Sequence, residues 1–259
     1  MGAPGALTLA RDWGRAVVDF VYPPACPLCH RRLTREDRTV CLLCEAQLKL
    51  RPDWQCPRCG GRGCGAPPES GRRCRLCPPG GAAWLGALSV VGYSDFAARC
   101  VHLFKYNRRL ELGGVMARLM AEHLAEPVGA LGGRLDRIAP VPLHWARRLA
   151  RGFNQSERLA RALAAATGLE LDTRLLRRLR HTKRQALVPK DLRAENVRGA
   201  FGLRAGREVR RQGILLVDDV VTTGETVNEC AKALKDAGAR EVWVACFARA
   251  GVGRGADEE

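Results

Sequence analysis

The chain has 259 residues, of which 46% are hydrophobic, so it is long enough and apolar enough to fold around a core. It carries 43 Lys and Arg against 27 Asp and Glu, and this net charge of +16 suits nucleic acid, a phosphorylated metabolite or an acidic membrane surface. Because most of the cations are arginines, an ordinary Arg-rich solvated surface explains the charge equally well. No segment reaches the ~18 uncharged apolar residues that a bilayer span requires, so we expect no membrane span and a cytoplasmic protein.

Segment 1–22 has apolar residues at helical spacing: Leu9, Trp13, Ala16, Val17 and Phe20. The charged side chains of Asp12, Arg15 and Asp19 interrupt any apolar stretch, which excludes a secretory signal. We therefore expect a short amphipathic helix that packs on the protein.

Cysteine is concentrated in residues 23–80, which hold nine of the twelve. Eight of these nine form four CxxC pairs: Cys26/Cys29, Cys41/Cys44, Cys56/Cys59 and Cys74/Cys77. Stable disulfides are uncommon in the cytosol, whereas two thiolates on one turn and two on another bind tetrahedral zinc. Short polar loops separate the pairs, so metal must supply the folding energy. We predict a double zinc ribbon over residues 23–80 that holds two structural Zn²⁺ ions with these eight ligands.

The spacing leaves some features of this module open. The pairs are combined either in sequence order or interleaved, first with third and second with fourth. Cys64 is either a free thiol or a ligand that competes with Cys56 or Cys59. A redox dithiol or a disulfide framework is the alternative, but no βαβ pattern surrounds the pairs. Four protein ligands leave no open position at either zinc ion, which indicates a structural or recognition role. Because the thiolate set is complete without it, we expect His30 to be solvated.

Residues 81–250 follow a Pro-Pro-Gly-Gly run and have a different pattern, in which strands alternate with helices. We expect strands at 85–93, 137–141, 214–217 and 242–247. Helices are expected at 97–104, 110–125, 156–167 and 223–237. This alternation predicts an α/β fold with a parallel sheet and helices on both faces, followed by a disordered tail at 251–259.

The segment 214–226, ILLVDDVVTTGET, predicts a phosphate-binding loop. A buried apolar strand ends at two adjacent carboxylates, Asp218 and Asp219, and a Thr/Gly turn then opens a helix. Successive backbone N–H groups, hydroxyls and the helix dipole suit a phosphate dianion, and Gly224 has no Cβ to block its approach. An ordinary strand–turn–helix with a capping Thr is the alternative, but it does not account for the paired acids. We infer a sugar phosphate whose vicinal hydroxyls the acids hold.

This loop matches the phosphoribosyl-pyrophosphate motif of type I phosphoribosyltransferases. Together with the cysteine-rich N-terminus, the segment Val141–His144 and the segment RGFNQSERLA that begins at Arg151, it makes nearly the whole chain resemble the ComF family of competence proteins. The resemblance implies a type I phosphoribosyltransferase-like domain preceded by the double zinc ribbon. It also implies that Asp218 and Asp219 hold the ribose hydroxyls and that 222–226 wrap the 5′-phosphate.

The ligand set expected for phosphoribosyl pyrophosphate has two parts. The loop contributes Asp218, Asp219, Val220, Val221, Thr222, Thr223, Gly224, Glu225 and Thr226. The family also has a pyrophosphate loop after the strand at 137–141, where this chain has Leu143, His144, Arg147 and Arg148. A guanidinium suits pyrophosphate oxygens, although a solvated basic helix face is the alternative for the two arginines.

Three further segments are less specific. Residues 180–199 resemble a mobile hood that closes over the site, with the polar side chains Thr182, Gln185, Arg193 and Asn196. Lys105 and Tyr106 belong to a segment that the family shares, with no role evident from their chemistry. Trp145 and Phe153 either stack on the bases of a nucleic acid strand or belong to the core.

Two functions follow from these features. The first is a protein that binds phosphoribosyl pyrophosphate with Mg²⁺ and supports DNA uptake by binding single-stranded DNA, with a competence helicase or uptake proteins as further partners. The second is an active phosphoribosyltransferase of nucleotide salvage whose acceptor is unknown. Nothing in the sequence identifies the group that would attack the ribose, so no catalytic residue is predicted.

Overall fold

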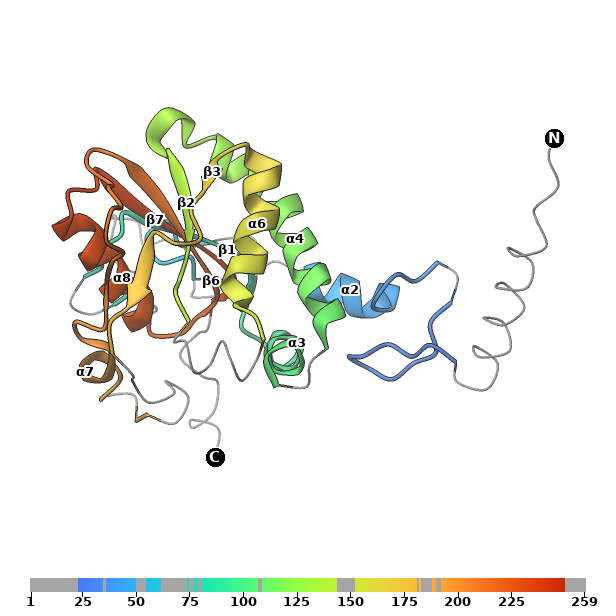
Figure 1. Ribbon diagram of the computed structural model, residues 1–259. Helices are drawn as coiled ribbons and strands as arrows, with labels where there is room; N and C mark the ends of the chain where they lie inside the picture. Colours follow the sequence, from blue (N-terminus) through green and yellow to red (C-terminus); the bar gives the residue numbers. More distant parts are fainter. Residues whose placement is uncertain are drawn as a thin grey trace. The chain divides into compact units, whose positions relative to one another are not determined.

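A computed structural model describes residues 23–34, 36–49, 55–61, 74, 77–78, 81–106, 109–143, 152–180, 182, 188–189 and 192–249 (Figure 1). The chain divides into two compact units, Met1–Gln47 and Leu48–Glu259. The larger unit therefore contains the second pair of CxxC turns as well as the α/β domain. The helix expected at 1–22 and the tail expected at 251–259 lie outside the described residues.

The smaller unit contains a cysteine turn followed by a helix. In the turn, the Cys26 N–H donates to the Arg31 carbonyl and the His30 N–H donates to the Cys26 carbonyl, each at 2.8 Å. His30 has a φ of 63°, because the chain must reverse directly after Cys29. Helix α2 (Leu42–Lys49) then begins directly after Cys41, so it carries Cys44 in its first turn.

The larger unit is built on a five-stranded parallel sheet with the order β1-β7-β6-β2-β3. These strands are β1 (Gly86–Gly92), β2 (Arg137–Pro140), β3 (Glu170–Leu171), β6 (Gly213–Val221) and β7 (Glu241–Arg249). The central strands are almost fully buried, as expected for a sheet that helices cover on both faces. A separate antiparallel pair consists of β4 (Leu176–Arg178) and β5 (Phe201–Leu203).

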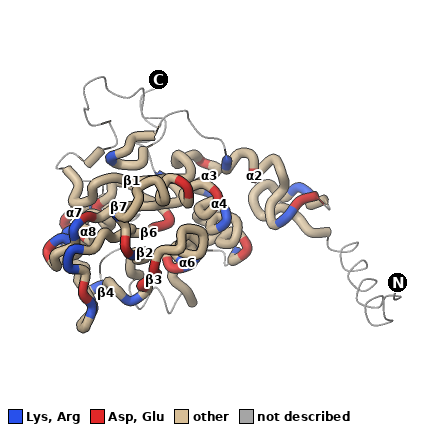
Figure 2. The backbone as a smooth tube through the Cα atoms, turned by 90° about the horizontal axis from the view of Figure 1, so that it is seen from above, with Lys and Arg blue, Asp and Glu red and all other residues tan. Residues whose placement is uncertain are grey.

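Helices cover both faces of this sheet (Figures 1 and 2). Helices α4 (Leu110–Gly129) and α6 (Gln155–Thr167) pack against each other and against one face, and α3 (Asp95–Tyr106) packs on α4. Helix α8 (Glu225–Asp236) packs on the other face, with the short helix α7 (Arg193–Val197) beside it. Between α8 and the sheet lies a core that includes Ile214, Leu216, Val227, Leu234 and Val244.

The alternation of strands and helices confirms the predicted α/β fold, although three short strands and helix α7 were not predicted. Helix α2 was not predicted either, and it occupies part of the expected polar loop between the second and third CxxC pairs. The strands β3, β4 and β5 have only two or three residues each, too few for an alternating pattern to stand out. No helix among the residues that the structure describes is both long and apolar enough to cross a membrane.

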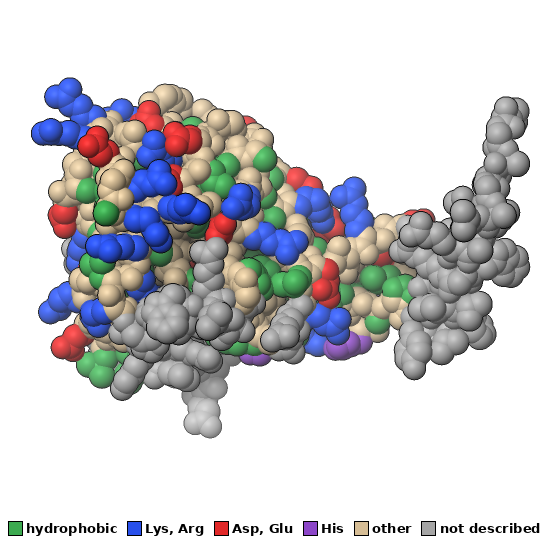
Figure 3. Space-filling view, viewed as in Figure 1, with side chains coloured by type: hydrophobic (Ala, Val, Ile, Leu, Met, Phe, Trp, Pro, Cys, Tyr) green, Lys and Arg blue, Asp and Glu red, His purple; other side chains and the backbone are tan. Residues whose placement is uncertain are grey.

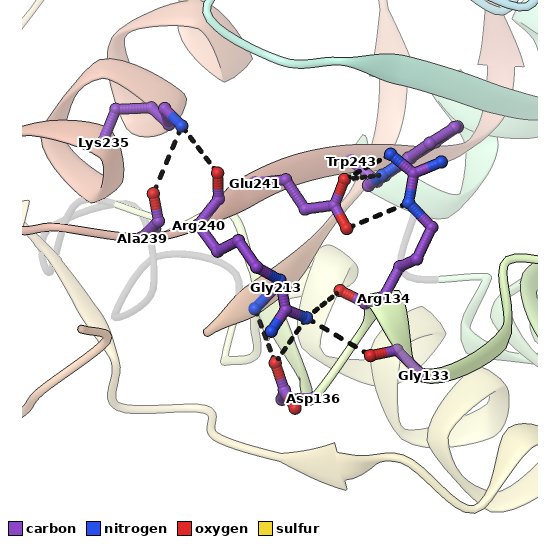
Figure 4. Close-up of polar contacts among 9 residues, drawn as sticks. All are labelled: Gly133, Arg134, Asp136, Gly213, Lys235, Ala239, Arg240, Glu241 and Trp243. Carbon is purple, nitrogen blue, oxygen red and sulfur yellow. Dashed lines mark hydrogen bonds and ion pairs between the residues drawn. The ribbon is translucent and has the colours of Figure 1, made fainter. Parts of the chain in front are cut away.

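A network of charged side chains ties the strands together at the end of the sheet where β6 and β7 begin (Figure 4). Arg134 binds Glu241 at 2.6 Å and lies 5.4 Å from the Trp243 ring centroid. Arg240 binds Asp136 at 3.2 Å, and Asp136 also accepts a hydrogen bond from the Gly213 N–H at 2.6 Å. Because Arg240 also donates to backbone carbonyls there, the network has a structural role at the end opposite the phosphate loop.

Candidate functional site

The predicted phosphate loop lies at the carboxyl end of β6, where ligands bind in open α/β sheets. The strand is longer than the predicted 214–217, because its pairing with β7 continues through Asp218 to Val221. The turn that follows ends at Gly224, whose φ of 88° is the left-handed conformation that glycine adopts at low cost. Helix α8 begins at the next residue, Glu225. The expected strand, turn and helix are therefore present.

A cavity of about 460 Å³ opens over this loop. All residues from Asp218 to Val227 line it, and Leu143 of the predicted pyrophosphate loop does so as well. His144, Arg147 and Arg148 lie outside the described residues, so their contact with pyrophosphate stays a prediction. The remaining lining includes Tyr93, His102, Lys105, Tyr106, Asn154, Ser156, Arg178 and Arg193. Several of these residues were not expected at the site.

The two acids of the loop differ in their surroundings. Asp218 accepts a hydrogen bond from the Ser156 hydroxyl at 2.8 Å and another from the Asp219 N–H at 2.9 Å. Burial, with a contribution from the neighbouring Asp219 charge, raises the pKa of Asp218 to about 7. The carboxyl of Asp218 therefore changes its charge near neutral pH.

Asp219 is only 5% exposed and binds the ammonium group of Lys105 at 2.8 Å. Its carboxylate also accepts the Val220 N–H at 2.7 Å. Lys105 comes from helix α3, far from the loop in sequence, and it places a cation beside Asp219 in the lining of the cavity. The sequence had marked Lys105 only through its family segment, and the structure gives it a contact at the site.

A second wall of the cavity comes from the segments around β4 and α7. Arg178 lies over the Phe201 ring at 5.0 Å and donates a hydrogen bond to the buried hydroxyl of Thr182. Arg193 lines the same wall and donates to the Val188 carbonyl at 3.0 Å. Two guanidinium groups thus line the same cavity as the two carboxylates, and guanidinium groups suit a ligand that carries phosphate oxygens.

The sequence left open whether Phe153 and Trp145 stack on bases or belong to the core, and the structure tests this for Phe153. The Phe153 ring packs against Phe104 with centroids 5.3 Å apart, which favours the core alternative over base stacking. Trp145 lies outside the described residues. The rings that do line the cavity are those of Tyr93, His102 and Tyr106, and the last two have centroids 4.9 Å apart.

The cysteines form two clusters in sequence order, Cys26/Cys29/Cys41/Cys44 and Cys56/Cys59/Cys74/Cys77, which excludes the interleaved pairing. The sulfur atoms of each cluster lie within 4.8 Å of one another. Four sulfurs around one zinc ion at about 2.3 Å are about 3.8 Å apart. The separations of 3.6 Å for Cys29–Cys41 and 3.8 Å for Cys56–Cys77 therefore fit a tetrahedral metal. Cys64 lies outside the described residues.

Arginine side chains gather near the β4–β5 pair on the face shown in Figure 3, where Lys and Arg outnumber the acids. The exposed arginines among the described residues of 174–211, the segment that contains this pair, are Arg174, Arg177, Arg180, Arg198, Arg204, Arg207, Arg210 and Arg211, and we call this set the arginine face. Of these side chains, Arg207 is close to a carboxylate, at 3.4 Å from Asp172.

Known proteins resemble the chain in both of its modules. The double zinc ribbon domain family matches residues 17–78, and the phosphoribosyl transferase domain family matches residues 147–259. A purine phosphoribosyltransferase structure from Pyrococcus horikoshii aligns with 52% of this chain and 72% of its own, at 17% identity and a TM-score of 0.35 that is too low to carry weight.

Three relatives match most of the chain. DNA utilization protein YhgH of Salmonella typhi is 36% identical over 233 residues, which are 89% of this chain and 99% of that protein. Competence protein F of Haemophilus influenzae is 28% identical over 87% of this chain and 96% of its own. Competence protein ComFC of Streptococcus pneumoniae is 25% identical over 81% of this chain and 87% of its own. The chain therefore belongs to the ComF family, and it joins a double zinc ribbon to a phosphoribosyl transferase domain.

Proposed function

We propose that the protein binds phosphoribosyl pyrophosphate, or a related sugar phosphate, in the cavity over β6 and supports DNA uptake by binding single-stranded DNA. The observation that carries the first part is the juxtaposition of two adjacent carboxylates with a phosphate-type turn. Asp218 and Asp219 hold the 2′- and 3′-hydroxyls, and the turn at 222–226 holds the 5′-phosphate. If Mg²⁺ binds with the ligand, Asp218 and Asp219 are the carboxylates that would hold it, and it would neutralise charge on the pyrophosphate.

The rest of the cavity supports the same ligand. Lys105 compensates one of the two adjacent negative charges, so both acids fit at one site. Arg178 and Arg193 line the same cavity, and in this proposal their guanidinium groups hold pyrophosphate oxygens. The residues at 144–148 complete the pyrophosphate contacts in this proposal.

Titration calorimetry with phosphoribosyl pyrophosphate and Mg²⁺ tests the first part. The wild type is expected to bind, and the double variant Asp218→Asn/Asp219→Asn is expected to lose the heat signal, because each amide has no negative charge and replaces one of the two acceptor oxygens with an NH₂ donor. Asp236→Asn is the matched control, since Asp236 is exposed at the end of α8, away from the cavity. Equal affinity of the wild type and the double variant would contradict this site.

The arginine face supports the second part, together with the names of the relatives, which refer to competence and DNA utilization. Guanidinium groups bind phosphates, and each neutralised phosphate makes affinity more dependent on salt. We expect a labelled single strand to bind at low salt and to dissociate steeply as salt rises. The variant Arg177→Ala/Arg204→Ala is expected to weaken binding and to reduce the salt slope by about 1.4, at ~0.7 for each phosphate contact in a single strand. No single-strand affinity at low salt would remove this part of the proposal.

An active phosphoribosyltransferase is the second candidate, and the phosphoribosyl transferase domain match favours it. Among the described residues, the rings of Tyr93, His102 and Tyr106 line the same cavity as the acids. Pyrophosphate release from phosphoribosyl pyrophosphate, measured across nucleobases and amines, separates binding from transfer. Release that depends on one acceptor and is lost in Asp218→Asn would establish the enzyme.

A further inference from the structure

The second cysteine cluster is attached to the edge of the sheet. The turn at 56–61 repeats the geometry of the first cysteine turn, with the Gly60 N–H donating to the Cys56 carbonyl at 2.9 Å. This turn pairs with β1: the Ala87 N–H donates to the Pro57 carbonyl at 3.0 Å and the buried Ser89 hydroxyl donates to the Gly60 carbonyl at 2.6 Å. The backbone of this turn is therefore hydrogen-bonded to the edge strand β1 at two points.

Arg249 connects this turn to the phosphate loop. Its side chain, on the last residue of β7, is 1% exposed. The guanidinium donates through Nε to the Cys59 carbonyl at 2.8 Å and through one terminal nitrogen to the Val221 carbonyl at 2.9 Å. One planar group thus fixes the distance between a cysteine ligand and the last residue of β6.

Trp84 makes a second connection between the same two segments. Its indole N–H donates to the Arg58 carbonyl at 2.8 Å, between the two cysteines of the turn. The other side of the ring lies against Gly224, where an added Cβ would approach the indole to 2.8 Å. Trp84 is buried, so the ring cannot move away without disturbing one of its two contacts.

The positive charge of Arg249 also favours its position beside the second cysteine cluster. Four thiolates and one Zn²⁺ carry a net charge of −2, and a buried guanidinium is stable only near compensating charge. The Arg249 guanidinium donates to the carbonyl of Cys59, one of the four ligands, which places its positive charge beside the cluster. Residues that hydrogen-bond to metal ligands orient those ligands, and they also orient the neighbouring segments to which they bind.

We propose that the second cluster is a component of the phosphoribosyl site, with Arg249 and Trp84 as positioning residues that transmit the metal-bound shape of residues 56–59 to residues 221–224. This inference rests on the proposed function, because the affected ligand is the one held by that loop. The first cluster lies in the smaller unit and serves as an internal comparison.

Calorimetry with phosphoribosyl pyrophosphate and Mg²⁺ tests the coupling on the full-length, zinc-loaded protein. Cys56→Ser is expected to weaken binding about 5- to 150-fold, the usual range for coupled sites, whereas Cys26→Ser in the first cluster is expected to leave it unchanged. By reciprocity, saturating ligand should raise the zinc affinity of the second cluster by the same factor and leave the first unchanged. Equal effects of the two variants, or zinc affinities that ignore the ligand, would overturn the proposal.

Substitutions at the two positioning residues separate coupling from folding. Arg249→Met and Trp84→Phe remove the donors to the cysteine turn. We expect them to weaken the ligand while zinc content and the circular dichroism spectrum stay unchanged, and Arg249→Lys is expected to restore part of the affinity. Full affinity in both donor-free variants would refute the roles assigned to these residues.

Hydrogen exchange tests the coupling of the second cluster to residues 221–224 separately from the binding of phosphoribosyl pyrophosphate. Removing zinc from the second cluster with a chelator should accelerate amide exchange at residues 221–226, and removing it from the first should not. If the wild type binds no phosphoribosyl pyrophosphate, the proposed function fails, but this exchange measurement still decides the coupling. Unchanged exchange at 221–226 after loss of the second metal would overturn it.

Discussion

The substitution Asp218→Asn is expected to stabilise the ligand-free protein while it abolishes the proposed binding. Burial and the adjacent Asp219 charge raise the pKa of Asp218 from 3.8 to about 7. Above pH 7 this carboxyl is ionised in both the folded and the unfolded protein, and the folded state carries the full cost of burying the charge. An amide of the same shape removes that cost and still accepts the Ser156 hydrogen bond.

The magnitude follows from the change in pKa. Each unit of pKa change corresponds to about 1.4 kcal/mol, so the free-energy cost of burying the ionised Asp218 above pH 7 is about 4 kcal/mol at most. Asp218 is partly exposed at the cavity, so solvent screens part of this cost, and we expect a net gain of about 1–2 kcal/mol at pH 8.

The pH dependence of stability is a second test of whether Asp218→Asn stabilises the protein. Because the folded-state pKa is the higher one, stability from this group is complete below about pH 4 and is lost as the pH rises through 7. The difference in free energy of unfolding between Asp218→Asn and wild type should therefore grow between pH 5.5 and pH 8.5, by about 2 kcal/mol at most. Urea denaturation followed by circular dichroism at several pH values measures it.

Asp236→Asn is the control for that series, since it changes the net charge equally on an exposed helix end. The reasoning is refuted if Asp218→Asn is less stable than wild type at pH 8, or if its advantage does not depend on pH. Either result would mean that Asp218 is compensated in the folded protein by interactions stronger than those of Lys105 and Ser156.

The affinity for phosphoribosyl pyrophosphate should fall about tenfold from pH 8 to pH 6, because protonation of Asp218 removes an acceptor for a ribose hydroxyl; calorimetry in buffers of different ionisation heat would detect the linked proton release. Gly224→Ala should destabilise the fold by about 1–3 kcal/mol, since alanine is strained at a φ of 88° and its Cβ would strike Trp84; thermal melts measure this, and an unchanged Tm would contradict the turn geometry. Lys105→Met should cost about 1–3 kcal/mol in unfolding free energy by leaving the buried Asp219 without this cation, and Lys105→Arg should recover most of the loss; equal stability of both variants would show that the ion pair is not the cause.

Local patterns in the sequence were sufficient for much of the fold and for the core of the site. The strand before Asp218, the Thr/Gly turn and the helix after it were predicted because each depends on neighbours a few residues apart. The metal clusters were predicted for the same reason, since each CxxC turn holds two ligands by itself. The pyrophosphate loop at 143–148 stays a prediction, apart from Leu143, which lines the cavity.

Contacts between distant segments decided the rest. The acids belong to β6 because β7 continues to pair with them, and no property of 214–221 alone reveals the length of that partner. The pairing of the CxxC turns, the partner of Asp219 and the two contacts of Arg249 likewise join residues far apart in the chain. A sequence determines which groups are available and what its local turns hold, whereas burial and packing select which distant charge or carbonyl each group meets.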